Sequence, residues 1–262
     1  MAKSIFISIL EKDEAKGKGL FQTVIRYGLG VNGHFWSDNL EKMEWAGPIG
    51  EMEKPEVGVW LIKGGKASYE NPETRFGLSL LAAAVQARRG HGFPILCICD
   101  DGELDPATLP TMLRGAEVVD EAKLGAKLAA KANMPIKKVA AEYRFDLYPL
   151  PSLGLWLEVG PAPGHAWKGA LLGVCDGDDS DAGIGAHGVG SAGQLPERCV
   201  LNYPMKGLKM ELGGKEFIGW AVKNGLSENE SYFVKVTGTP DALIFGEFPD
   251  GDDAEFYSLQ LK

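Results

Sequence analysis

The first half of the chain alternates short apolar runs with stretches of helical periodicity. The clearest apolar runs, at residues 4–10, 57–62 and 93–99, predict buried strands. Residues 74–89 are apolar on nearly every face and predict a well-covered helix, and residues 121–132 predict an amphipathic one. Weaker strands are predicted at 34–36 and 116–119. Strands that alternate with helices of these lengths predict an α/β unit, a flavodoxin-like doubly wound parallel sheet covered on both faces.

The pattern changes near residue 136. Beyond it, short strand-like runs follow one another between turn residues, without helical periodicity. They lie at residues 142–148, 154–159, 170–174, 198–202, 216–222, 232–237, 242–248 and 255–261. The glycine-rich stretch 183–193 reads as a loop. We therefore expect two domains: an α/β domain over 1–136, and an all-β sandwich or jelly-roll-like domain over 137–262 that serves as a recognition module.

The distribution of charge supports the division into two domains and excludes some classes of binding partner. The chain has a net charge of −9, and residues 1–135 carry 16 Lys and Arg against 18 Asp and Glu, whereas the rest carries 11 against 18. Such an acidic chain predicts no nucleic-acid partner, because phosphate binding needs a basic patch. No apolar run approaches the roughly 18 residues of a membrane span, and the N-terminal residues do not resemble a signal peptide. We expect a cytoplasmic chain with no membrane partner.

The cysteines and the acidic turns predict no metal site. Cys97, Cys99, Cys175 and Cys199 lack the spacing of zinc ligands and are expected to be reduced, buried thiols. Residues 176–181 and 250–253 share an Asp-Gly-Asp-Asp string, which is typical of hairpin turns. Solvated turns are the preferred interpretation, and an irregular cation site is the alternative.

Candidate chemistry gathers where the predicted parallel strands end, because that edge of an open α/β sheet binds ligands. Glu73 lies in the first turn of the helix that begins at Asn71-Pro72, where a carboxylate could stabilise an oxocarbenium-like transition state. In the alternative interpretation, Glu73 only complements the helix dipole and the nearby aromatic residues belong to the core. The candidate binding residues beside it are Ser8, Trp36, Asp38, Ser68 and Tyr69.

Several of these residues resemble motifs of the Toll/interleukin-1 receptor (TIR) domain. Ser4-Ile5-Phe6-Ile7-Ser8 is similar to the family's opening strand, and Ser68-Tyr69 followed by Glu73 is similar to its S-x-W-x-x-x-E region, with Tyr in place of Trp. Further similarities lie at residues 93–96, 109–110 and 118–120, while the stretch between residues 38 and 57 is short for the family's second helix and its loop. Nucleoside deoxyribosyltransferases share a similar topology and a catalytic glutamate.

The resemblance implies two functions. In enzymatic TIR domains the glutamate serves cleavage of the NAD glycosidic bond, which makes Glu73 the candidate catalytic residue. Tyr69 and Trp36 would then stack on the base or nicotinamide, and Ser8 and Asp38 would contact ribose or phosphate. NAD is thus a candidate substrate, and no cofactor is expected. Other TIR domains are scaffolds, so the alternative is a non-catalytic module that binds a protein partner or self-associates, in signalling or defence.

Overall fold

The computed structural model describes residues 3–177, 181–249 and 255–262. The chain divides into two compact units, Met1–Val139 and Ala140–Lys262. The first is an α/β unit and the second consists of antiparallel sheets, so the predicted combination of α/β and β structure is confirmed. None of the described helices is long and apolar enough to cross a membrane.

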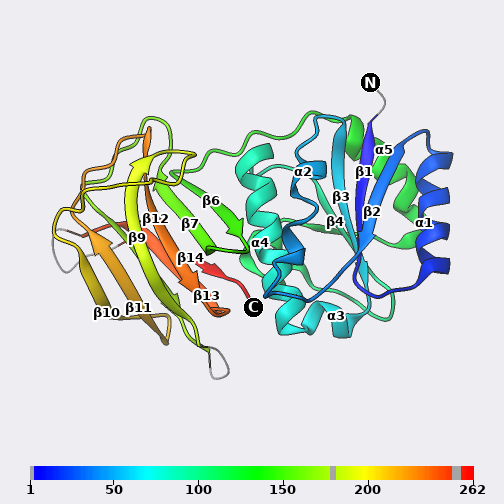
Figure 1. Ribbon diagram of the computed structural model, residues 1–262. Coiled ribbons are helices and arrows are strands. Elements are labelled where there is room, and N and C mark those ends of the chain that lie inside the picture. The colour runs from blue at the N-terminus through cyan, green and yellow to red at the C-terminus, as the bar shows by residue number, and fades with distance from the viewer. Residues whose placement is uncertain (1–2, 178–180, 250–254) are drawn as a thin grey trace. The chain divides into compact units, whose positions relative to one another are not determined.

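The first unit is built on a parallel five-stranded sheet (Figure 1). Its strands run in the order β2-β1-β3-β4-β5. Every residue of β3 is buried, which its continuous apolar sequence predicted for a central parallel strand. The strands are β1 (Ser4–Ile9), β2 (Gly30–Phe35), β3 (Val57–Gly64), β4 (Ile95–Cys99) and β5 (Glu117–Val118).

Helices cover both faces of this sheet, as predicted, with α1 and α5 on one face and α4 on the other (Figure 1). Leu20 of α1 and Leu128 of α5 pack against the same core face of the strands. The α-helices are α1 (Glu14–Arg26), α2 (Ile49–Met52), α3 (Lys66–Glu70), α4 (Pro72–Arg89) and α5 (Leu124–Asn133). Short 3₁₀ turns are η1 (Glu44–Ala46), η2 (Pro106–Thr108), η3 (Thr111–Leu113) and η4 (Glu121–Lys123).

Helix α4 begins where the sequence predicts. The Asn71 side chain accepts hydrogen bonds from the backbone N–H groups of Glu73 and Thr74, and Pro72 occupies the first turn. The helix ends at Gly90, whose φ of 89° few other residues tolerate. Local sequence thus fixes both ends of the helix that carries the candidate glutamate.

The second unit consists of two antiparallel sheets in the orders β6-β7-β12-β9 and β10-β11-β8-β13-β14. Phe145 of β6 lies 5.3 Å from Phe245 of β13 between ring centroids, so the inner faces of the two sheets pack together. The strands are β6 (Tyr143–Leu150), β7 (Gly154–Pro161), β8 (Ala170–Cys175), β9 (Gly183–Ser191), β10 (Met205–Leu212), β11 (Lys215–Val222), β12 (Glu230–Thr237), β13 (Ala242–Glu247) and β14 (Tyr257–Gln260).

Two predictions for this unit are wrong. Residues 198–202 form no strand, and the glycine-rich stretch predicted as a loop contains strand β9. Two of its glycines, Gly188 and Gly190, allow close packing: a Cβ on Gly190 would lie 2.9 Å from Cβ of Pro196, in the segment that covers β9. Glycine-rich composition predicts a loop only when nothing lies against the backbone.

The cysteines are all free, and Cys199 is exposed rather than buried as expected. No group of three or more potential metal ligands occurs among the described residues. The cation alternative for the acidic turns rests largely on residues 178–180 and 250–253, which lie outside the described residues. Within the described part, the Asp176 carboxylate accepts a hydrogen bond from the backbone N–H of Ala182, as a turn residue does.

Candidate functional site

The carboxyl edge of the parallel sheet brings together three of the residues predicted from sequence. Ser8 is the last residue but one of β1, and Trp36 and Asp38 follow β2. The Trp36 Nε1 donates a hydrogen bond to Asp38 Oδ1 at 2.8 Å, and Thr74 Oγ1 of α4 donates to the same carboxylate at 2.9 Å. Because Asp38 binds both partners, it fixes the Trp36 ring against the start of α4.

His34 of β2 links Ser8 to this cluster, and sequence reasoning did not identify it as a site residue. The Trp60 indole N–H donates to Ser8 Oγ at 3.0 Å, and Ser8 Oγ lies 2.8 Å from His34 Nε2. Burial lowers the pKa of His34 to about 4, so its ring is neutral near pH 7. An indole N–H can only donate, so Ser8 Oγ accepts the bond from Trp60, and the His34 tautomer sets which partner donates in the bond between Ser8 and His34.

Ser8 itself is fully buried. His34 in turn meets the Trp36 ring edge-on, with ring centroids 5.8 Å apart. A continuous chain of contacts therefore runs from Trp60 through Ser8 and His34 to Trp36, and the buried Ser8 hydroxyl contacts Trp60 and His34.

Ser68 and Tyr69 lie apart from this cluster. Ser68 donates a hydrogen bond to Glu11 Oε1 at 2.5 Å, and the same oxygen accepts the backbone N–H of Gly65. Tyr69 is 1% exposed, and its hydroxyl bonds to the backbone carbonyls of Ile62 and Ile98. Burial raises the pKa of Tyr69 well above its usual value. Its ring belongs to the core, so the expectation that Tyr69 stacks on a ligand does not fit this position.

Glu73 is exposed in the first turn of α4, directly before Thr74, whose hydroxyl binds Asp38. Among the described residues, no side chain forms a hydrogen bond or ion pair with the Glu73 carboxylate. The positive end of the helix dipole favours its negative charge. The carboxylate is therefore free to meet a ligand at the edge of the sheet.

A second group of charges lies farther along the same edge, and sequence reasoning missed it. Lys63, near the end of β3, has a side chain only 4% exposed, and its Nζ lies 2.5 Å from Asp100 Oδ1 and 3.3 Å from Glu121 Oε2. Lys16 of α1 also binds Asp100, at 3.0 Å. Burial alone would raise the pKa of Asp100, but hydrogen bonds from Lys63 and Lys16 lower it below its usual value.

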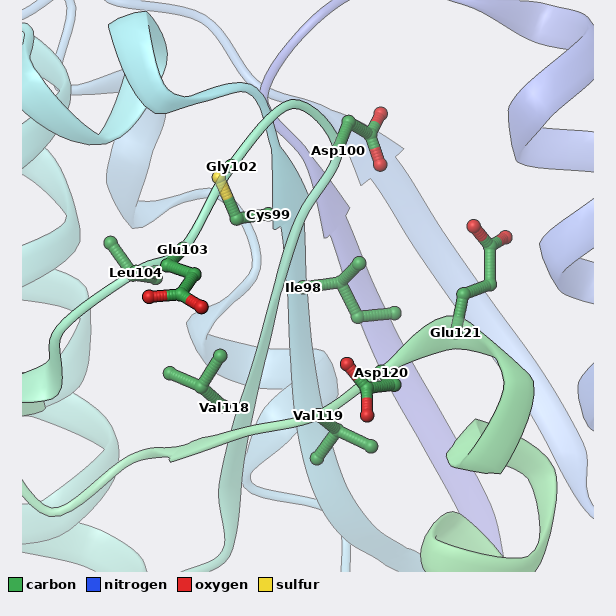
Figure 2. Close-up of a pocket in the computed structure, with 10 residues that line it drawn as sticks. All are labelled: Ile98, Cys99, Asp100, Gly102, Glu103, Leu104, Val118, Val119, Asp120 and Glu121. Atoms are coloured by element: carbon green, nitrogen blue, oxygen red, sulfur yellow. The ribbon is translucent and has the colours of Figure 1, made fainter.

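This group borders a cavity of about 440 Å³ at the ends of β4 and β5. Figure 2 shows Glu103, on the loop after β4, across the cavity from Asp120. The carboxylates of Asp100 and Glu121 also line it. The rule used for Ser8 could have found these acids, because Asp100 directly follows β4 and the others lie within four residues of a strand end, whereas no sequence signal predicts a buried lysine next to them.

Comparisons with known proteins do not assign the chain to a family. No family model matches the chain, and no curated protein matches it. Nine chains of solved structures match, among them the structure titled "Crystal structure of ChBD3 from Thermococcus kodakarensis KOD1". That match has 12% sequence identity and a TM-score of 0.22, and it covers 40% of this chain and 84% of the other. A similarity this low does not bear on fold or function.

Proposed function

We propose that the first unit is a TIR-like domain that hydrolyses the bond between nicotinamide and ribose in NAD. The observation that carries the proposal is the unpaired carboxylate of Glu73, one residue before Thr74, which bonds to Asp38 in the cluster of Trp36, Asp38 and Thr74. The strand order β2-β1-β3-β4-β5 supports it, because this is the flavodoxin-like order, in which ligands bind beyond the carboxyl ends of the strands.

In this mechanism the C1′–N1 bond breaks and its electron pair leaves with nicotinamide, and water then adds to C1′ and loses a proton. Glu73 stabilises the positive charge that develops on the ribose. Because Glu73 is exposed, the bound dinucleotide itself must exclude water from the carboxylate for this interaction to be strong. Trp36, held by Asp38, offers the aromatic surface for a flat ring.

The variant Glu73→Gln separates this role from a structural one. If Glu73 only complements the helix dipole, the variant loses about 0.3–1 kcal/mol of stability and keeps all activity. If Glu73 is catalytic, the rate of nicotinamide release falls by about a hundredfold or more while the unfolding free energy changes little. Glu70→Gln is the matched control, because Glu70 is an exposed glutamate of the preceding helix α3.

A second candidate is a non-catalytic assembly module, which a groove between α1 and β2 favours. The groove measures about 470 Å³ and is lined largely by apolar side chains, including Phe21, Ile25 and Phe35. A second copy of this chain suits the groove. In an antiparallel pair of α1 helices, Glu14 in the first turn of one helix would lie opposite Arg26 in the last turn of the other. Sedimentation velocity of the parent and of Ile25→Ser tests this candidate. We expect the parent to form a dimer and the variant to be a monomer. A parent that sediments as a monomer would exclude the assembly module.

A further inference from the structure

The segment between β9 and β10 exposes two large apolar side chains. Val200 is 81% exposed and Tyr203 is 78% exposed, more than any other large apolar residue in the described part of the chain. Single exposed apolar residues are ordinary, but two of them three positions apart on one loop indicate a contact surface. We call residues 198–209, which carry both and include the first five residues of β10, the basic loop.

The structure holds this loop in place rather than leaving it loose. Asn224 accepts a hydrogen bond from the Asn202 backbone N–H at 2.8 Å and donates one to the Val200 carbonyl at 3.0 Å. The Lys223 N–H binds the Asn202 carbonyl at 2.8 Å. Tyr203 has a φ of 48°, which is uncommon for an aromatic residue. Such backbone strain persists where surrounding contacts enforce it, and it clusters at functional sites.

The loop also concentrates positive charge in an acidic unit. Arg198, Lys206 and Lys209 are exposed, and no Asp or Glu occurs within residues 198–209. The whole of residues 140–262 has nine Lys and Arg against 18 Asp and Glu. The nearest acids in the sequence are Glu197 and Glu211, which flank the loop and offset part of its charge. At physiological salt the screening length is about 8 Å, so acids farther away on the unit weaken the field of this loop only slightly.

We propose that the basic loop binds an anionic lipid surface. Val200 and Tyr203 enter the headgroup region, where the tyrosine ring is buried and its hydroxyl stays hydrated, while Arg198, Lys206 and Lys209 meet lipid phosphates and carboxylates. The high exposure of Val200 and Tyr203 favours a fluid surface that needs no matching pocket over a bound peptide. With one small loop, binding is reversible and sensitive to salt.

Co-sedimentation of the full chain with vesicles tests this proposal. Phosphatidylcholine vesicles that contain phosphatidylserine should bind the parent protein, and pure phosphatidylcholine vesicles should bind it far less. The double variant Val200→Ser/Tyr203→Ser should lose at least about tenfold in vesicle affinity, and Lys209→Glu should lose a comparable factor. Matched controls are Leu153→Ser, at another exposed apolar residue of the unit, and Lys42→Glu, at an exposed lysine of the first unit.

Equal binding of the parent and the double variant would overturn the proposal, as would equal binding to the two kinds of vesicle. If the parent binds neither kind but self-associates in sedimentation velocity, and the double variant does not, a second copy occupies the loop and the lipid assignment is wrong. Urea unfolding of each variant confirms that it folds, which the exposure of both side chains leads us to expect.

Discussion

At the scale of single residues, the candidate site at the carboxyl edge of the parallel sheet depends on hydrogen bonds that no sequence pattern predicts. The positions of Ser8, Trp36 and Asp38 at strand ends predicted that they lie near one another, and the structure places them in one cluster. The sequence could not show that Tyr69 turns into the core, because an aromatic residue beside a strand end fits either position. The sequence also could not show that Glu158 is buried. Its carboxylate accepts hydrogen bonds from Tyr148, Ser231 and Gly193, which are distant in the sequence.

His34 makes stability depend on pH. Its pKa is lowered from 6.5 to about 4 in the folded chain, so the unfolded chain binds a proton more readily. The resulting stabilisation is fully present above pH 6.5 and is lost as the pH falls toward 4, a change of roughly 3 kcal/mol. Urea unfolding at pH 7.5 and 4.5 should show that His34→Gln, which keeps a hydrogen-bonding group for Ser8, removes a large part of this loss.

The exposed His165 provides the control for this prediction. His165→Gln should leave the acid-induced loss of stability unchanged. If His34→Gln and the parent lose the same free energy between the two pH values, burial does not shift the His34 equilibrium as described.

At the scale of elements, local periodicity predicted the strands and helices whose burial follows from their own sequence. Strand β3 and helix α4 are apolar throughout and buried throughout, so their sequences and environments agree. Strand β9 was missed because Gly188 and Gly190 are required by Pro196, which lies six or more residues further along the chain. Short-range patterns carry no information about the segment that later covers a strand.

Two alanine substitutions in β9 test this explanation. Gly190→Ala should destabilise the protein by about 1–3 kcal/mol, because the new methyl group would lie 2.9 Å from the rigid Pro196 ring. Gly185→Ala is the matched control: its methyl group would have ordinary contact distances of 3.5 Å or more, so its stability should stay level or rise slightly. Equal unfolding free energies for the two variants in urea would contradict the account.

At the scale of the whole molecule, the change in sequence pattern near residue 136 predicted two domains, and the chain contacts divide at Val139. We expect trypsin to cut first at Lys137 or Lys138, in the stretch between α5 and β6, because few contacts cross a domain boundary. Mass spectrometry should then find two protected fragments. Earlier cleavage inside either unit, or one protected chain, would count against independent units.

The central claim is that the free carboxylate of Glu73 performs chemistry at the carboxyl edge of the parallel sheet. The most direct test is nicotinamide release from NAD, followed by NMR, for the purified full chain and for Glu73→Gln at equal concentration. We expect release by the parent in proportion to protein concentration, and a rate at least about a hundredfold lower for the variant. Release by Glu73→Gln at the parent's rate would contradict this claim.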